Sequence, residues 1–275
     1  MRFDHSGPCP LVQRTGASHT WSMPGTTNQG SPKRSRGSVR IARLLGVDIL
    51  LHWTFPVLLL LVIWSYWSQG RAAVASGLVW VVAIFASVVV HELSHCVVAR
   101  RRGAVVLDIL LTPIGGMSQL NAMPESASDE LAVAIVGPLT SFGLALLAAF
   151  GGLAAGASLW PPTLFAGSWF ARLLWLNFLL GAFNMLPALP MDGGRVLRAS
   201  LARRYDRRTA THIAVRFARY IAFLMLIAGL FYDFWLIIIG IFLLVAASAE
   251  EGATSNGHDD RADPGQATGV SRHPS

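Results

Sequence analysis

Long apolar segments constrain the fold of this chain more than any other feature. A helix that crosses a membrane needs about 20 predominantly apolar residues, and runs of that length occupy 47–68, 73–99, 130–156 and 168–189. A fifth stretch, 212–248, is too long for one crossing, and "LFYDF" at 230–234 divides it into a predicted helical hairpin. Charged residues make up 13% of the 275-residue chain, against about 25% in soluble domains. We therefore expect an all-α polytopic membrane protein with about six transmembrane helices.

The segments outside the apolar runs divide the chain into three predicted parts. Residues 1–40 are basic and rich in Gly, Ser, Thr and Pro, and residues 250–275 are polar. Both are predicted to be disordered tails on either side of a membrane domain at 41–249. Within this domain, 104–128 is too interrupted by Gly and Pro for a spanning helix and carries β-branched residues. It is predicted to form a small membrane-associated β element between the second and third spans.

Positive charge is concentrated between the apolar segments and gives a net charge of +7. Clusters of Lys and Arg precede the first span, follow the second at 100–102, and lie between the fourth and fifth at 195–208. With six spans these clusters fall on one side, which predicts a multi-pass plasma-membrane protein with both termini in the cytoplasm. The basic residues do not form a face with interleaved aromatics on a soluble domain, so the expected partner is the lipid bilayer and not nucleic acid.

The second apolar run contains a polar cluster, "HELSH" at 91–95. His91 and His95 are four residues apart, which places both imidazoles on one face of a helix, where they can bind one zinc ion. Glu92 lies on the flank of that face, where a carboxylate can take a proton from water; this is the H-E-x-x-H arrangement. Each ionisable group costs roughly 2.5–3.5 kcal/mol at the centre of a membrane helix. A cluster that only joins helices through hydrogen bonds is therefore the weaker interpretation.

A catalytic zinc site has three protein ligands and one open position, so this cluster needs one more ligand. Asp192, in "FNMLPALPMDGGRVLR" (183–198), is the predicted third ligand, because the prolines end the fourth span near the depth of His91. The alternative is that Asp192 is the N-cap of the following helix. Glu125 and Glu130 are predicted to be solvated or to cap helices.

The combination of "HELSH" with the later "NMLPALPMDGGR" resembles the site-2 protease family of intramembrane zinc metalloproteases, in its bacterial members. The segments "LLGVDILLHWTF", "PIGGMSQL" and "AIVGPLTSFGLALL" are also similar, so the resemblance extends over about residues 40–248. It implies that His91, His95 and Asp192 bind one Zn²⁺ per chain. It also implies that Glu92 is the catalytic base.

The resemblance further assigns residues that would contact the substrate. Asn184 would hold the substrate chain or its oxyanion, and the 104–121 region, which includes Gly115 and Gly116, would present a strand edge to an extended substrate. The implied activity is hydrolysis of peptide bonds within or near the transmembrane segment of a membrane-anchored protein, such as an anti-sigma factor or a signal-peptide remnant. Relatives often carry cystathionine-synthase-like regulatory modules or a PDZ domain, and neither is expected here.

Two other classes of function remain open for the same residues. A metal transporter would need ligands along a path and no general base, and zinc flux without peptide cleavage would identify it. A catalytically inactive membrane scaffold could retain the fold, but all four residues of the predicted site, His91, Glu92, His95 and Asp192, are present.

Overall fold

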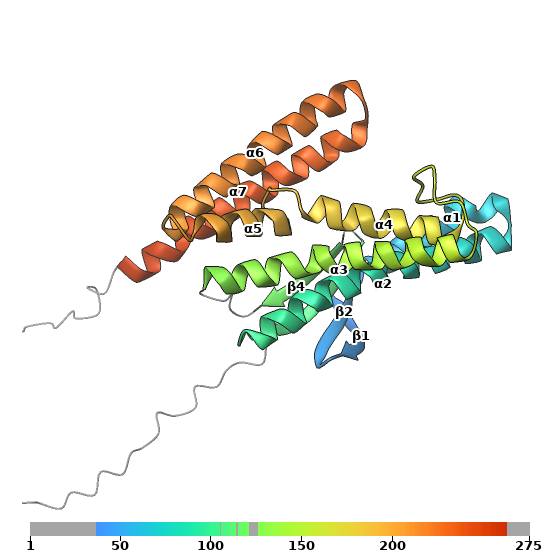
Figure 1. Ribbon diagram of the computed structural model, residues 1–275, viewed down its shortest axis with the longest axis horizontal. Helices are drawn as coiled ribbons and strands as arrows, with labels where there is room; N and C mark the ends of the chain where they lie inside the picture. The colour runs from blue at the N-terminus through green and yellow to red at the C-terminus, as the bar shows by residue number, and fades with distance from the viewer. Residues whose placement is uncertain (1–36, 105, 114, 121–125, 263–275) are drawn as a thin grey trace, which may run out of the picture. The chain divides into compact units, whose positions relative to one another are not determined.

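The computed structural model describes residues 37–104, 106–113, 115–120 and 126–262. The sequence predictions for 1–36 and 263–275 therefore lie outside the described residues. In chain order the elements are β1 (Ser38–Leu44), β2 (Val47–His52), α1 (Phe55–Tyr66), the 3₁₀ helix η1 (Trp67–Gln69), α2 (Arg71–Arg101), β3 (Val106–Thr112), β4 (Gly115–Leu120), α3 (Ala127–Ala154), α4 (Trp169–Asn184), α5 (Asp192–Leu201), α6 (Arg207–Phe231) and α7 (Phe234–Ala262) (Figure 1).

Three helices among the described residues are long and apolar enough to cross a membrane: α2, α3 and the part of α6 from Arg208. Two shorter apolar helical stretches, Phe55–Gln69 and Phe234–Ala249, accompany them. The helix α4 has 16 residues, which corresponds to a length of about 24 Å. The chain is thus a mostly helical protein with three candidate membrane spans.

A four-stranded sheet is larger than the small β element that the sequence predicts in an otherwise helical protein. Its strand order is β1-β2-β3-β4, with antiparallel outer pairs and a parallel β2–β3 pair. The pair β3–β4 is the predicted β element, whereas β1 and β2 take up the end of the predicted tail and the start of the first predicted span. Residues 47–52 are therefore a strand and not part of a spanning helix. A short continuous apolar run fits a buried strand as well as a helix, and periodicity alone does not separate the two.

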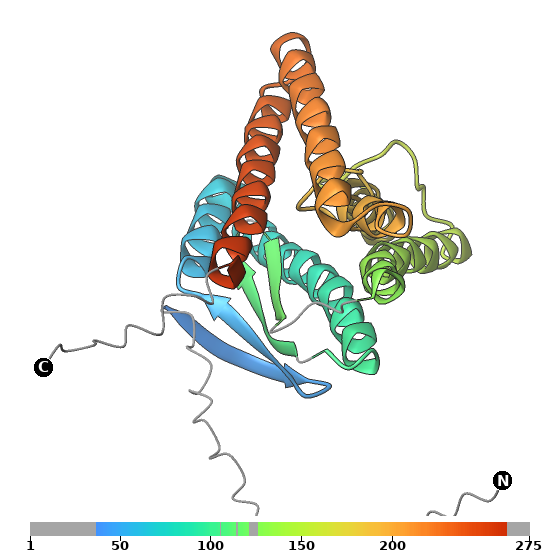
Figure 2. The same ribbon diagram turned by 90° about the vertical axis from the view of Figure 1, so that its left-hand side faces the viewer.

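The sheet is held against α2 by an apolar core (Figure 2). Alternate residues of the central strands, Val47 and Ile49 in β2 and Ile109 and Leu111 in β3, pack with Cys96 of α2. Cys96 is fully buried within this core. Because α2 carries the histidine cluster, the packing also fixes the sheet beside the candidate site.

The remaining helices pack in sequence order. The helix α3 contacts α2, α4 and α5, while α6 contacts α5 and forms a hairpin with α7 (Figure 1). This hairpin was predicted from the break at 230–234, and its small core includes Ala214, Ala218 and Leu243. The helix α7 continues to Ala262, past the predicted domain boundary at 249, so residues 250–262 of the predicted tail are helical.

Candidate metal centre

Two helices bring three ligand atoms together at one point. His91 and His95 lie on one face of α2, and Asp192 begins α5; all three side chains are buried, with 2%, 3% and 7% of each residue exposed. The Nε2 atoms of the two histidines lie 3.2 Å apart. Asp192 Oδ2 lies 3.2 Å from Nε2 of His91 and 3.1 Å from Nε2 of His95. The third ligand predicted from the sequence therefore meets the histidine pair.

These separations suit a tetrahedral zinc site. Zinc binds imidazole nitrogen at about 2.0–2.1 Å and carboxylate oxygen at about 2.0–2.2 Å, so neighbouring ligand atoms of a tetrahedral ion lie about 3.3 Å apart. The three atoms form a nearly equilateral triangle of this size. Two histidines and a carboxylate are also ligands typical of catalytic zinc, which keeps a fourth position open.

The opposite ring nitrogens of both histidines are held by α3. His95 Nδ1 donates to the carbonyl oxygen of Val133 at 2.6 Å, and His91 Nδ1 lies 2.9 Å from Ser141 Oγ. A histidine that protonates Nδ1 in such a bond leaves the lone pair of Nε2 for a metal. The two contacts thus fix each ring in the orientation that a metal ligand needs.

Gly137 lies between these two supports on the same face of α3. A Cβ atom at this position would collide with Nε2 of His95 and would lie 2.8 Å from Nε2 of His91. The absence of a side chain at Gly137 therefore lets the two imidazoles lie directly against the helix. No sequence prediction assigned this role to Gly137.

The backbone around Asp192 is packed too closely for side chains. A Cβ at Gly193 would collide with the carbonyl oxygens of Met185 and Leu186, and one at Gly194 would lie 2.8 Å from the carbonyl oxygen of Ala188. The two glycines therefore let the start of α5 press on the segment that follows α4. The N-cap of α5 is Met191, so the alternative role of Asp192 as N-cap is wrong.

The charge of Asp192 is set by its neighbours. Burial acts to raise the pKa of this carboxyl, but the hydrogen bonds with His91 and His95 outweigh burial and hold the pKa well below its usual range. The second carboxylate oxygen, Oδ1, lies 3.8 Å from Nη1 of Arg195, three residues further along α5. Asp192 is therefore an ionised carboxylate at neutral pH, as a metal ligand must be.

Glu92, the predicted base, lies where β4 begins. It is half-buried on α2, and a Cβ at Gly116 would lie 3.0 Å from Cγ of Glu92 and 3.0 Å from Cγ1 of Val88. Among the described residues β4 pairs with β3 and is the last strand of the sheet. The start of this edge strand, with Gly115 and Gly116, is therefore placed against the helix turn that carries Glu92.

Comparison with known proteins identifies the family of this chain. The sequence model of peptidase family M50 matches residues 79–158 and 163–229, which include both histidines and Asp192. The chain belongs to peptidase family M50. It is 36% identical over 219 residues to the zinc metalloprotease MJ0392 of Methanocaldococcus jannaschii, covering 78% of this chain and 60% of the relative. It is also 36% identical over 244 residues to Rip3 of Mycobacterium tuberculosis, covering 78% of this chain and 59% of the relative.

A solved structure shows the same fold. The site-2 protease from Methanocaldococcus jannaschii superposes with a TM-score of 0.57 at 32% identity, covering 78% of this chain and 95% of the solved chain. The predicted resemblance to site-2 proteases is thereby confirmed. Membership of family M50 and the apolar helices together identify a membrane protein. The chain spans about 60% of the length of the curated relatives MJ0392 and Rip3.

Two other residues named in the sequence predictions, Asn184 and Glu130, make contacts within the protein. Asn184 ends α4, and its Nδ2 donates to the carbonyl oxygen of Leu180 at 2.9 Å, a contact within the helix. Glu130 is buried in an ion pair with Arg198, so the prediction that it is solvated or a cap is wrong; Glu125 lies outside the described residues. The burial of Glu130 has no local sequence signal, because its partner comes 68 residues later.

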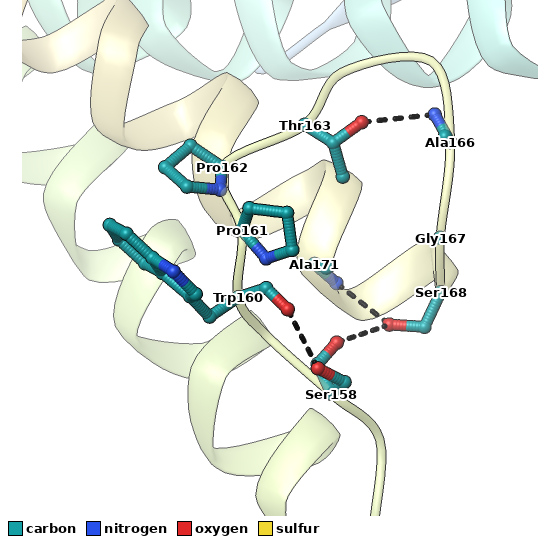
Figure 3. Close-up of a pocket in the computed structure, with 9 residues that line it drawn as sticks. All are labelled: Ser158, Trp160, Pro161, Pro162, Thr163, Ala166, Gly167, Ser168 and Ala171. Carbon is teal, nitrogen blue, oxygen red and sulfur yellow. Dashed lines mark hydrogen bonds between the residues drawn. The ribbon is translucent and has the colours of Figure 1, made fainter.

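A cavity of about 380 Å³ lies away from the metal centre, in the segment that joins α3 to α4 (Figure 3). Its lining includes Trp160, Pro161 and Pro162. The hydroxyls of Ser158 and Thr163 are engaged with backbone groups of the same segment. Because its lining holds no ionisable side chain, this cavity offers no acid, base or charged ligand for hydrolysis, and the buried cluster of His91, His95 and Asp192 remains the candidate site.

Proposed function

We propose that this chain is an intramembrane zinc metalloprotease that hydrolyses peptide bonds within or near the transmembrane segment of membrane-anchored proteins. The observation that carries the proposal is the convergence of His91 Nε2, His95 Nε2 and Asp192 Oδ2 at 3.1–3.2 Å. These three residues would hold the ion. When bound, zinc polarises the scissile carbonyl and lowers the pKa of a water ligand to about 7.

Glu92 supplies the proton transfers in this proposal. Its carboxylate takes a proton from the attacking water and passes it to the leaving amine nitrogen, the usual work of a general base that becomes a general acid. Val133 and Ser141 keep the histidine rings in place during these steps. Because the ligand residues are less than one-tenth exposed, few water molecules surround the cluster, and electrostatic interactions within it are strong.

The substrate lies in an extended conformation along β4. A helix conceals its own amide groups, so it must unwind before hydrolysis, and a strand edge satisfies the freed backbone groups by β-augmentation. A Cβ at Gly115 would meet no atom within 4 Å, whereas Gly116 lies against Glu92, so β4 passes close to this carboxylate. Asn184 binds the substrate carbonyl after its amide turns away from Leu180 O. The substrate class includes proteins such as a membrane-anchored anti-sigma factor or a signal-peptide remnant.

Reconstitution tests this function. The full chain in proteoliposomes, with a tagged single-span test protein whose helix is weakened near its cytoplasmic end, should produce two fragments. 1,10-Phenanthroline should stop cleavage and added Zn²⁺ should restore it, because hydrolysis depends on the bound ion. Zinc flux into the vesicles without any fragment would identify a transporter. Bound zinc with neither flux nor fragments would identify an inactive scaffold.

A plasma-membrane topology of six spans with both termini in the cytoplasm belongs to the same proposal. It is supported by the arginines after α2 and around 203–208, which would share one side. With Cys9 and Cys96 replaced, an impermeant maleimide should label Gln69→Cys and Tyr232→Cys on intact cells. It should label Tyr205→Cys only after permeabilisation. External labelling at position 205 would contradict the topology.

A further inference from the structure

The position of the third metal ligand, Asp192, depends on how α5 is placed. Asp192 is separated by about 100 residues from the histidines that it meets, and it reaches them from the first turn of α5. The helix α5 packs on α3, which also supports both histidine rings. Any shift of α5 along or around α3 would move Asp192 Oδ2 relative to the two Nε2 atoms, so the contact between these helices matters for the metal site.

A buried ion pair joins the two helices. Arg198 on α5 donates from Nη2 and Nε to the same carboxylate oxygen of Glu130 on α3, at 2.6 and 2.9 Å. The side chains are only 8% and 4% exposed. Two donors from a planar guanidinium fix the orientation of the arginine relative to the carboxylate as well as the distance between them. The pair therefore restricts sliding and rotation of α5 on α3.

The face of α3 that holds Arg198 is also the face that holds the histidines. Glu130 precedes Val133 by three residues, Gly137 by seven and Ser141 by eleven, which is the spacing of one helical face. On α5, Arg195 approaches Asp192 Oδ1 at 3.8 Å and leaves Oδ2 toward the histidines. One surface thus orients all three ligands, two through hydrogen bonds to the rings and the third through α5.

Stability alone does not account for this pair. Replacement of a buried ion pair by well-packed apolar residues is often neutral or stabilising, so such pairs are poor sources of stability and are better suited to fixing one arrangement. We propose that Glu130 and Arg198 are positioning residues, whose ion pair holds α5 on α3 so that Asp192 Oδ2 stays within reach of the two histidine nitrogens. This inference rests on the proposed ligation of zinc by His91, His95 and Asp192.

The test measures zinc affinity in the full chain, purified in detergent, by competition with a chelator on the monodisperse folded fraction. Glu130→Gln keeps the size of the side chain but removes its charge, and zinc should bind about 10–100-fold more weakly, as for other outer-shell partners. Arg198→Lys keeps the charge but loses the fork of donors, so its affinity should lie between those of Glu130→Gln and the wild type.

Asp129→Asn is the matched control. Asp129 is the neighbour of Glu130 and pairs with Arg102. This pair is more exposed to solvent, because 25% of the Asp129 side chain and 46% of the Arg102 side chain are accessible. Its removal should leave zinc affinity unchanged. A purely structural role for Glu130 would reduce the folded yield without altering the zinc affinity of the folded fraction, and that result would overturn the inference.

Two further outcomes keep the inference separate from the proposed function. If Glu130→Gln does not fold, Arg198→Lys decides, and wild-type zinc affinity in that variant refutes the positioning role. If the wild type binds zinc through its three ligands and the variants weaken it, but no substrate is cleaved, the positioning role stands and the protease function fails.

Discussion

Replacement of Glu92 by glutamine is expected to reduce cleavage by about 10²–10⁴-fold, the usual contribution of a general base, while zinc stays bound. Glutamine has the size of glutamate and can keep its packing beneath Gly116, but its amide cannot accept a proton from the attacking water. The measurement is cleavage of a tagged single-span protein under single-turnover conditions, with zinc content determined on the same preparation.

Asp192→Ala should behave differently from Glu92→Gln and serves as its comparison. Asp192 Oδ2 belongs to the triangle of ligand atoms, so its loss should lower zinc content together with activity. Equal loss of zinc in both variants would show that Glu92 is a ligand or a structural group. Cleavage by Glu92→Gln at nearly the wild-type rate would refute the proposed mechanism.

The meeting of the three candidate metal ligands could be predicted, because the signals for these residues are either local in the sequence or chemical. His91 and His95 are four residues apart, and that spacing alone places them on one face of α2. Asp192 is distant in sequence, but the need for a third ligand and the prolines that end α4 restricted the candidates. The structure brings the three atoms together as predicted.

The supports of the ligands could not be predicted in the same way. The partner of His95 is the backbone oxygen of Val133, and any residue type offers such an oxygen. Gly137 and Ser141 are small residues on an apolar helix, a pattern that also fits ordinary packing between membrane helices. Gly137 and Ser141 are four residues apart and so lie on one face of α3. This spacing indicates a role beside the histidines only once α3 is known to pack on α2.

The strands β1 and β2 show another limit. Residues 38–52 join a basic stretch to an apolar run, and the sequence pattern places them partly in a tail and partly in a span. Their pairing is decided by β3, which lies beside β2 in parallel register from Asp48↔Asp108 to Leu51↔Leu111. A parallel partner some 60 residues away leaves no trace in local periodicity.

Gly137→Ala is expected to weaken zinc binding by about 100-fold or more, the upper end of effects seen when outer-shell residues change, and to reduce cleavage with it. The added methyl group would lie 2.1 Å from His95 Nε2 and 2.8 Å from His91 Nε2, which is too close for both. The rings cannot simply move aside, because Val133 O and Ser141 Oγ hold their opposite nitrogens from the same helix. Relief of the collision requires the loss of these bonds or a shift of α2 from α3.

Gly143→Ala gives a matched control on the same helix. A Cβ at Gly143 meets no atom within 4 Å, so this variant should bind zinc as the wild type does and gain roughly 0.5–1 kcal/mol from the better helix former. Zinc affinity is measured for both variants by chelator competition on folded protein. Retention of wild-type affinity by Gly137→Ala would mean that the imidazoles do not lie against α3 when the ion is bound. The support of the two histidines by this helix would then have to be abandoned, whereas the identity of the three ligands would be unaffected.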